Sequence, residues 1–424
     1  MIRAAFSRED WIVFDLGFGD AGKGATVDFL VREREISLVV RFHGGAQAGH
    51  NVVTPEGKHH IFSQFASGTF VPGVCTLLGP DFLLHPGGML VEEKHLQSVG
   101  IQDVFERTFV DERAIVVTPF HQAAGRLREL HRGPEAHGTC GLGVGEAMED
   151  RLQERDDTIR AADLFRPDQL ASKLEQQRQR KHRKWSGLGQ REDLRVQSEL
   201  DLLSDTHSVE RTLQLWDLLR DRLQVCTAEE TKGRIQERGA VVFEGAQGIL
   251  LDQDHGFHPH TTWSDCTPGG ALALLEEINV RPVRLGVLRT YMVRHGIGPM
   301  PTHDPAWDGA LPELHNGDQG WQGPVRRGPL DLPLLRYAVR VAGGIDGLAV
   351  NGMDRIGEEV KVCVDRTSLS GKPWEGTSRF ESVKRHELGS FLEKELRKPV
   401  LIESWGPSAS DRKWRSLPKK GIME

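Results

Sequence analysis

The sequence has few cysteines, no long apolar run and no excess of positive charge. Its five cysteines are odd in number, widely scattered and free of CxxC spacing. This pattern argues against a disulfide framework or a zinc site and suits a reducing compartment. No stretch reaches the roughly 18 consecutive apolar residues that a membrane-spanning helix needs, and charged residues interrupt the N-terminus before a signal-peptide pattern develops. We therefore expect a cytoplasmic protein that does not contact a membrane.

The formal net charge of −7 argues against a general nucleic-acid-binding protein, because such proteins usually present a basic surface. A small anionic ligand needs only local positive potential and stays compatible with this charge. The 424 residues, 38% hydrophobic and 27% charged, have the composition of a soluble globular protein with a substantial core. Length and composition therefore favour an enzyme or a binding protein for small molecules.

Buried-strand patterns alternate with helical and loop stretches along the chain. Residues 11–16 read as a strand that passes through a glycine-rich segment into the helical spacing of residues 25–31. This is the first unit of an open parallel sheet. Further strands are expected at residues 38–42, 114–118, 240–244, 283–288 and 347–351. We predict an α/β protein with one large, mainly parallel central sheet, flanking helices and loop-rich subdomains.

Two segments differ from this pattern. Residues 151–236 are polar, rich in Gln, Arg and Glu, and helical in spacing, which predicts a helical subdomain within a single domain of residues 1–424. The basic run 176–184 is compatible with a nucleic-acid patch, but a solvated helix surface followed by an exposed turn at residues 186–189 is favoured. Residues 303–329 are rich in Pro, Gly and Trp and predict an extended loop.

The strongest local signal is the segment GFGDAGKG at residues 17–24. Glycines allow a phosphate to approach the backbone closely, and the following helix directs its N-terminal N–H groups at the anion. Lys23 supplies a mobile cation, and Asp20 is suited to bind Mg²⁺ or to take a proton. A Walker A loop would require Ser or Thr after the lysine, and Gly24 stands there instead. The segment therefore predicts a phosphate site of a different type.

Three further segments carry polar residues in glycine-rich turns. RFHGGAQAGHN, residues 41–51, contains His50, which is suited to donate a proton near neutral pH. HGTCGLGVG, residues 137–145, offers hydroxyl and backbone donors to an oxyanion. FEGAQGILLDQDHG, residues 243–256, leaves a buried strand where α/β sheets bind ligands. A metal site among the acids and histidines of residues 252–260 is disfavoured, since they lack the spacing of a known zinc site and suit turns and helix caps.

Together, these motifs resemble those of the adenylosuccinate synthetase family. FGDAGKG is similar to the family's GDEGKG, RFHGGAQAGHN to VRxxGGxNAGHT, HGTCGLGVGEAMEDR to IGTTxRGIGPAYxDK, and FEGAQGILLDQDHGFHPHTT to FEGAQGxxLDxDxGTYPxVT. Weaker similarities continue at residues 294–302, 351–354 and 404–407. The resemblance thus spans about residues 11–407.

The resemblance implies a homodimeric enzyme that joins IMP to L-aspartate with GTP and Mg²⁺, in AMP biosynthesis. Asp20 would remove the N1 proton of IMP, and His50 would act as an acid while the resulting oxyanion attacks the γ-phosphate of GTP. The amine of aspartate would then displace phosphate from 6-phosphoryl-IMP. Phosphoryl transfer mainly needs positioning and charge neutralisation, which Mg²⁺, Lys23 and the loop N–H groups would supply.

The resemblance also assigns residues to each ligand. The expected catalytic residues are Asp20, Lys23, His50 and Gln247. The expected GTP-binding residues are Gly19, Asp20, Ala21, Gly22, Lys23, Gly24, Gly49, His50, Asn51, Asp354, Ser404 and Gly406. The expected IMP-binding residues are Gln47, Ala48, Thr139, Arg155, Gln247 and Thr262. Arg326 and Arg327 are expected to bind aspartate, and Asp20 and the carbonyl of Gly49 to bind Mg²⁺.

Several positions depart from the family pattern. Ala21 replaces a Glu, Cys140 a Thr and Gly352 a Lys, while Glu154 stands where an Arg would reach the IMP phosphate across the dimer. The adjacent Arg155 is expected to take over that contact. The largest departure is WQGPVRR, residues 321–327, where the family has a Thr-Thr-Gly-Arg-x-Arg pattern. Arg326 remains where a bidentate carboxylate grip is expected, but the threonines and the first arginine are absent.

Two alternatives to an adenylosuccinate synthetase stay open. A paralogue would use the same chemistry on another purine nucleotide or amine, and the altered loop and Glu154 favour it. A non-catalytic GTP-binding regulatory protein is disfavoured, because Asp20 and His50 are retained. After the change at Gly352, ATP also stays open as the phosphate donor.

Overall fold

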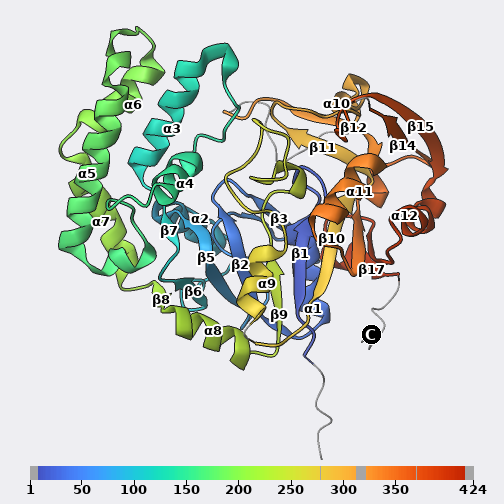
Figure 1. The fold of residues 1–424 in the computed structure, drawn as a ribbon. Coiled ribbons are helices and arrows are strands. Elements are labelled where there is room, and N and C mark those ends of the chain that lie inside the picture. Colours follow the sequence, from blue (N-terminus) through green and yellow to red (C-terminus); the bar gives the residue numbers. More distant parts are fainter. Residues whose placement is uncertain (1–7, 277, 312–320, 369, 416–424) are drawn as a thin grey trace, which may run out of the picture.

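A large, mainly parallel sheet runs through the protein (Figure 1). The computed structural model describes residues 8–276, 278–311, 321–368 and 370–415. All neighbouring strands of this sheet pair in parallel except β16 and β17. Its path is β17 (Arg412–Trp414), β16 (Val400–Ser404), β13 (Gly347–Asn351), β10 (Val283–Arg289), β1 (Trp11–Asp15), β9 (Ala240–Glu244), β2 (Ile36–Gly45), β5 (Cys75–Leu84), β6 (Thr108–Asp111) and β8 (Gln224–Cys226), with β7 (Ile115–Val116) beside β5.

Two smaller sheets flank the carboxyl ends of these strands. One has the order β11 (Tyr291–His295), β12 (Val325–Asp331), β14 (Glu359–Thr367) and β15 (Thr377–Lys384), and the other pairs β3 (His50–Val53) with β4 (His59–Phe62). The helices are α1 (Lys23–Glu33), α2 (Pro86–Ser98), α3 (Pro119–Arg132), α4 (Val144–Leu152), α5 (Pro167–Trp185), α6 (Leu194–Ser204), α7 (Ser208–Arg220), α8 (Ala228–Glu237), α9 (Gly269–Glu276), α10 (Pro305–Ala310), α11 (Leu332–Val341) and α12 (Leu388–Leu396). In Figure 1, α5, α6 and α7 stand at one end of the large sheet, and α11 and α12 lie with the four-stranded sheet at the other.

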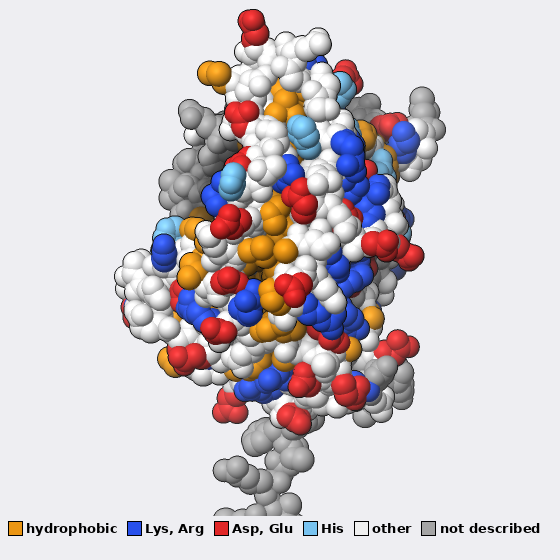
Figure 2. Space-filling model, turned by 90° about the vertical axis from the view of Figure 1, so that its left-hand side faces the viewer, with side chains coloured by type: hydrophobic (Ala, Val, Ile, Leu, Met, Phe, Trp, Pro, Cys, Tyr) orange, Lys and Arg blue, Asp and Glu red, His pale blue; other side chains and the backbone are white. Residues whose placement is uncertain are grey.

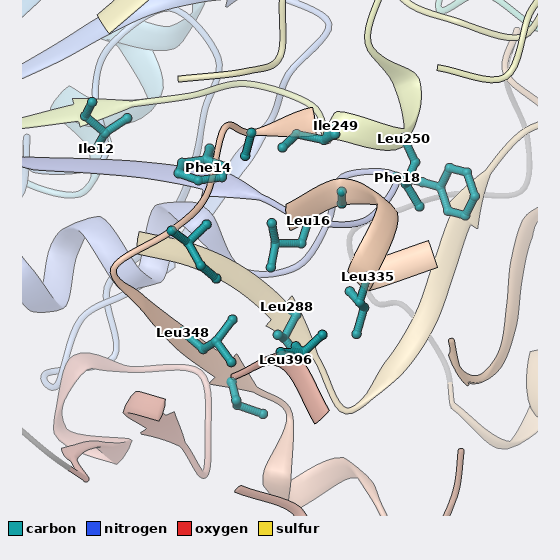
Figure 3. Packing of buried hydrophobic residues seen from close by; sticks show 14 of the residues in the cluster. Ile12, Phe14, Leu16, Phe18, Ile249, Leu250, Leu288, Leu335, Leu348 and Leu396 are labelled. Atoms are coloured by element: carbon teal, nitrogen blue, oxygen red, sulfur yellow. The ribbon is translucent and has the colours of Figure 1, made fainter. Parts of the chain in front are cut away.

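The core is built on both faces of β1, because successive side chains of a strand point to opposite faces. Ile12 and Phe14 belong to a cluster that includes residues of β10, α11 and α12, and Figure 3 shows this packing. Trp11 and Val13 belong to a second cluster that includes Leu30 of α1. This strand is buried along its whole length, so it forms a rigid base for the loop that follows it.

The predicted α/β architecture is confirmed, and five of the six expected strands form as β1, β2, β9, β10 and β13. The stretch 114–118 forms only the two-residue strand β7. The segment 303–329 is not a continuous loop, because α10 lies within it and β12 begins at Val325. Tertiary pairing with β11 overrides the local Gly and Pro content there. All five cysteines are free, and among the described residues no helix has the length and apolar character needed to cross a membrane.

The polar segment 151–236 contains α5 to α8 and the edge strand β8. Viewed from this end, acidic and basic side chains are interspersed around a narrow band of hydrophobic ones (Figure 2). The basic run 176–184 lies on α5, but it is not entirely solvated. Gln177, Arg178 and Lys181 are buried, and Lys181 Nζ lies 2.5 Å from Glu146 Oε2 and 3.2 Å from Asp150 Oδ1. The run therefore ties α5 to α4 through a buried ion network.

We predict that Lys181→Met lowers the free energy of unfolding by about 3 kcal/mol, because it leaves two buried carboxylates short of a cation. Lys184 on the same helix is the matched control, since it lies at the surface 3.5 Å from Glu149. Lys184→Met should change stability by less than about 0.5 kcal/mol. Urea unfolding monitored by circular dichroism measures both, and equal effects would contradict the prediction.

Candidate active site

The glycine loop after β1 is organised by the buried carboxylate of Asp15. The backbone N–H groups of Gly17 and Ala21 donate to its two oxygens at 2.7 and 3.0 Å. Lys23 Nζ donates to the same carboxylate at 3.1 Å and to the carbonyl of Gln247 at 2.6 Å. Asp15 thus closes the loop on itself and fixes the buried ammonium group of Lys23 against the loop that follows β9.

The backbone of this loop adopts left-handed conformations at three positions. Gly19, Asp20 and Gly22 have φ values of +96°, +58° and +94°. Glycine adopts such values readily, whereas Asp20 is a non-glycine residue held in a sparsely populated region, as is common at functional sites. Helix α1 starts at Lys23, and no side chain caps its N-terminus. Its first N–H groups and its dipole therefore favour an anion at the loop.

The absence of a Ser or Thr at position 24 has a steric cause. A Cβ atom on Gly24 would lie 2.8 Å from the Cβ of His50 and 2.9 Å from the Oγ of Ser67. Contacts this short require the neighbours to move. The close approach of α1 to the start of β3 therefore requires glycine here, and His50 takes the space that a Walker-type hydroxyl would need.

His50 is the end of a buried polar chain that begins at Glu244, the last residue of β9. The Nδ1 of His50 lies 2.6 Å from Glu244 Oε1, and the backbone N–H and hydroxyl of Ser67 also donate to Glu244. Burial raises the pKa of Glu244, but His50, Arg41 and Ser67 together lower it to about 2. Glu244 is therefore ionised, and it orients the His50 ring.

His50 is neutral at pH 7 in this arrangement. Burial lowers its pKa to about 4, assisted by the charges of Arg41 and Lys23 and opposed by Glu244. Nδ1–H donates to the Glu244 carboxylate, which leaves Nε2 buried and without a partner among the described residues. The expectation that His50 donates a proton near neutral pH therefore requires an anionic ligand that raises this pKa.

Two glutamine amides lie at the same edge of the sheet. Both amide atoms of Gln47 and of Gln247 are buried, and neither group has a partner in the described ranges. Buried polar groups are rarely left unsatisfied. Gln247 has φ +47°, and a Cβ atom on the next residue, Gly248, would lie 2.3 Å from the carbonyl oxygen of Gly17. The turn at Gln247 and Gly248 therefore packs closely against the glycine loop. The amides of Gln47 and Gln247 offer hydrogen-bond donors and acceptors to a polar ligand.

The residues that precede and follow His50 have separate structural contacts. The carbonyl of Ala48 accepts from Arg41 Nη2 at 3.3 Å, and the side-chain oxygen of Asn51 bonds to His59 across the β3–β4 pair. A Cβ atom on Gly49 would lie 2.8 Å from Ile61 Cγ2. These contacts fix the turn that carries His50.

The segment that contains Thr139 is held by a residue outside the motif. Glu129 of α3 accepts from the backbone N–H of Gly138 at 2.8 Å and of Thr139 at 3.3 Å. The Thr139 side chain lies at the surface. On the neighbouring loop, the N–H of Thr262 donates to the carbonyl of Leu251 at 2.7 Å. Both threonines thus sit in loops whose backbone is fixed by hydrogen bonds.

The loop after β13 is connected to the glycine loop. The Asn351 amide donates to the carbonyl of Ala21 at 2.9 Å, and the Thr290 hydroxyl donates to the carbonyl of Gly352 at 2.8 Å. Gly352 has φ +81°, a conformation that disfavours a side chain. The exposed Asp354 follows within η5 (Met353–Arg355).

The end of β16 lies beside this loop. β16 pairs with β13, and η5 also contacts β16. The buried hydroxyl of Ser404 donates to the carbonyl of Gly406 at 2.8 Å, and a Cβ atom on Gly406 would lie 2.6 Å from the Asp411 carboxyl carbon. Asp354, Ser404 and Gly406 therefore form one group next to the glycine loop.

Arg326 and Arg327 point to opposite faces of β12. Arg326 donates to the carbonyls of Gly296 and Gly298 at 2.6 and 2.8 Å and pairs across the strands with Arg294. The buried Arg327 donates instead to the carbonyls of Val325 and of Asp308 in α10. Since the side chains of a strand alternate between faces, the two arginines do not form one carboxylate grip in this structure.

The site of Arg155 lies at the end of α4. Arg155 Nε is 3.5 Å from Asp150 Oδ1, while the exposed Glu154 has φ +47°. This turn therefore presents the arginine against Asp150 and the acid to solvent.

The oxygen donors expected for Mg²⁺ are the Asp20 carboxylate and the Gly49 carbonyl. Mg²⁺ is commonly bound by one or two carboxylates completed by phosphate oxygens and water, so this small donor set fits a Mg²⁺ shared with a phosphate. Within the described ranges, no cluster of three or more His, Cys, Asp or Glu residues could hold a metal. Asp252 is instead a turn former, because its carboxylate accepts from the N–H groups of Asp254, His255 and Cys266.

Residues 12–411 match the family model described as adenylosuccinate synthetase. The chain belongs to the adenylosuccinate synthetase family. The enzyme from Chlorobium luteolum is 30% identical over 96% of this chain and 98% of its own length. The enzyme from Paraburkholderia phymatum is 32% identical over 85% of this chain and 80% of its own. This family member is an enzyme, a purine-biosynthesis ligase of the adenylosuccinate synthetase type, as the motifs predicted.

Solved structures give the same fold. The fully ligated adenylosuccinate synthetase from Plasmodium falciparum superposes with a TM-score of 0.79 at 21% identity, covering 96% of this chain and all of that one. A cyanophage S-2L succinoaminodeoxyadenylate synthetase, solved with dGMP and with dATP as energy donor, gives a TM-score of 0.64 at 16% identity over 97% of this chain and 96% of its own. At these identities the likeness concerns the fold.

Sequence reasoning missed several residues that hold the site together. Asp15 and Glu129 each accept from backbone N–H groups of a predicted loop. Glu244 binds the ring of His50 in another predicted loop and the backbone N–H of Ser67 outside the motifs. The only sequence signal for these roles is the position of each residue at or near the end of a strand or helix. Arg294 was seen only as part of a motif. It is buried and donates to the carbonyls of His260, Ile297 and Pro299, so it holds two loops together.

Buried neutral histidines should make stability depend on pH. Burial lowers the pKa of His43 from 6.5 to about 3, and its Nε2 accepts from the N–H of Ala246 at 3.1 Å. The unfolded chain binds this proton below pH 6.5 and the folded chain does not, so stability is full above pH 6.5 and is lost as the pH falls toward 3. His43→Gln keeps an acceptor without the titration. Between pH 7 and pH 4.5, we predict that it loses about 2 kcal/mol less stability than the wild type in urea unfolding, and parallel curves would contradict this.

Proposed function

We propose that the chain joins IMP to L-aspartate, consuming GTP and releasing GDP and phosphate through 6-phosphoryl-IMP. The observation that carries this proposal is the convergence of Lys23, His50 and Gln247 beside the glycine loop. Lys23 bonds to Asp15 and to the Gln247 carbonyl, and His50 and Gln247 each present buried polar atoms without a partner among the described residues. These groups are therefore suited to bind a phosphate anion and a polar nucleobase next to each other.

The glycine loop supports the binding of the triphosphate. Its left-handed turns, the uncapped N-terminus of α1 and the Lys23 ammonium supply backbone N–H groups and positive charge. Mg²⁺ held by the Asp20 carboxylate and the Gly49 carbonyl would neutralise phosphate charge. Asp354, Ser404 and Gly406 would bind the guanine base, because they follow β13 and β16, which lie two and three strands from β1 along the same edge.

In the first step, the Asp20 carboxylate would remove the N1 proton of IMP. The negative charge moves to O6, which attacks the γ-phosphorus of GTP as the bond to GDP breaks. Lys23 stabilises the charge on the phosphates. His50 becomes protonated when phosphate anions lie against Nε2, because they offset the cations that lower its pKa. Ionised Glu244 then stabilises the imidazolium through Nδ1.

In the second step, the amine of aspartate attacks C6 of 6-phosphoryl-IMP. The C6–O6 bond breaks, inorganic phosphate leaves with both electrons of that bond, and the amine loses a proton. Phosphorylation converts the poor oxygen leaving group of IMP into a good one, so the ligation needs no further activation. Gln47 and Gln247 are suited to hold the purine, because their amides offer both donors and acceptors.

A different amine substrate is the second candidate, and the contacts of Arg326 favour it. This guanidinium already donates to the carbonyls of Gly296 and Gly298, and Arg327 faces α10. A dicarboxylic amine would therefore have to draw Arg326 from these carbonyls. A smaller or less acidic amine would leave them in place.

Phosphate release with Mg²⁺, GTP and IMP, with and without L-aspartate, tests the proposal. We expect aspartate-dependent release with adenylosuccinate identified by mass spectrometry. Asp20→Asn should lower kcat at least about 100-fold, because it removes the base, while asparagine tolerates the positive φ at this position. Glu35→Gln is the matched control, since Glu35 is an exposed acid with φ +48° at the other end of α1.

The outcomes separate the candidates. Product without added aspartate, or with another amine only, would refute aspartate as the substrate and support the paralogue. Full activity of Asp20→Asn would remove Asp20 from the mechanism whatever the amine is.

We further propose a homodimer in which Arg155 of each subunit contacts the IMP phosphate in the partner's site. Light scattering after gel filtration should then give twice the mass of one chain. Arg155→Ala alone should raise the KM for IMP about tenfold or more, as expected for a lost charge-assisted contact. Mixing the Arg155→Ala and Asp20→Asn proteins should restore activity. A dimer with one chain of each kind has one site in which both Asp20 and the partner chain's Arg155 are intact. A monomer with wild-type activity, or no restoration after mixing, would refute shared sites.

A further inference from the structure

An exposed tryptophan follows β16 next to the residues proposed for the base. Trp405 is 39% exposed, although its backbone N–H is fixed by a bond to the carbonyl of Asp411 at 2.9 Å. Tryptophan combines a large apolar ring with a polar N–H group and is enriched at binding interfaces. The indole therefore presents a rigidly mounted aromatic surface to solvent.

A cation is held over this indole ring. The guanidinium carbon of Arg385 lies 5.6 Å from the ring centroid, within the range of a cation–π contact. Arg385 is itself anchored, since its Nη1 donates to the carbonyl of Ile356 and its backbone N–H to the carbonyl of Glu358. Arg385 thus connects the segment that follows Asp354 to the ring of Trp405.

Trp405 follows β16, the third strand from β1 along the sheet, where the base of a nucleoside triphosphate bound at the glycine loop would lie. The phosphate loop follows β1, and β10, β13 and β16 succeed β1 in the sheet. The loop after β13 bonds to the glycine loop through Asn351, and η7 (Ala409–Asp411), which follows Trp405, packs against α1. A nucleotide whose phosphates lie at the N-terminus of α1 would extend over β13 toward β16.

A purine base at this position would have hydrogen-bonding partners along its edge. No side chain at the end of β13 would cover the face of its ring. Asp354 and Ser404 are suited to its hydrogen-bonding edge. Gly352, with φ +81°, has no side chain to cover a ring face. We infer that Trp405 stacks on the purine base of the phosphate donor and replaces a covering side chain from position 352. This inference rests on the proposed GTP site and adds the residue that contacts the base face.

Stacking and edge recognition contribute differently to the choice of nucleotide. Every base has a π face, so stacking on an indole is tolerant of base identity. A carboxylate accepts from guanine N–H groups and has no equivalent partner on adenine. Trp405 therefore sets how tightly a purine triphosphate binds, and Asp354 sets which purine is preferred.

Equilibrium binding of GTP, ATP and inorganic tripolyphosphate to Trp405→Ala tests the inference. We expect GTP and ATP each to bind about tenfold more weakly, whereas tripolyphosphate, which has no base, binds as in the wild type. Trp405→Phe should recover most of the GTP affinity because it keeps an aromatic face. Asp354→Asn should weaken GTP but not ATP.

Phe380→Ala is the matched control. Phe380 is an exposed aromatic residue on β15 with Lys361 Nζ 4.7 Å from its ring centroid, so it reproduces the cation–aromatic pair away from the proposed base site. Unchanged GTP binding to Trp405→Ala, or an equal loss for tripolyphosphate, would overturn the inference. These measurements use binding alone. A wild-type protein that binds GTP without forming adenylosuccinate would therefore refute the proposed reaction, but the binding data would still test whether Trp405 stacks on the base.

Discussion

The site depends on a negative charge buried at the end of the central strand β9. Glu244 is inaccessible to solvent, and its carboxylate binds the His50 ring together with the backbone N–H and hydroxyl of Ser67. A buried carboxylate is costly unless hydrogen bonds and opposite charge compensate it. Ser67, His50 and Arg41 come from three different segments, so their compensation of Glu244 also assembles the loops around it. The contacts that hold these segments together therefore also orient the reactive ring.

Much of the fold could be read from the sequence because its signals are local. Continuous apolar runs predicted β1, β9, β10 and β13, and the glycine loop predicted the start of α1. The four-stranded mixed sheet was not predicted, because β12 begins within a Gly- and Pro-rich stretch and owes its strand conformation to pairing with β11. Likewise, the basic run on α5 gave no sign that Lys181 would be buried against Glu146, since that contact depends on where α4 lies.

For the site, motifs identified the loops but not what holds them. Gly24 was recognised as a departure from a Walker loop, yet its cause, the closeness of His50 and Ser67, is a contact between distant segments. The pairing of Arg326 and Arg327 in sequence suggested a common role, and strand alternation separates them. His50 is expected to donate a proton near neutral pH, and burial beside Lys23 and Arg41 lowers the pKa of the unliganded ring to about 4. Each of these properties is set by tertiary neighbours.

The close packing at Gly24 also limits how this site can change over evolutionary time. Any residue other than glycine there would meet the Cβ atom of His50 at 2.8 Å, so a metal-binding hydroxyl cannot be gained by one substitution. His50 would first have to move, and its ring is fixed by Glu244. A lineage that keeps the histidine is thereby committed to a phosphate loop without the Walker hydroxyl. Variation is left to positions that do not share this contact, such as Ala21, Gly352 and the loop before β12.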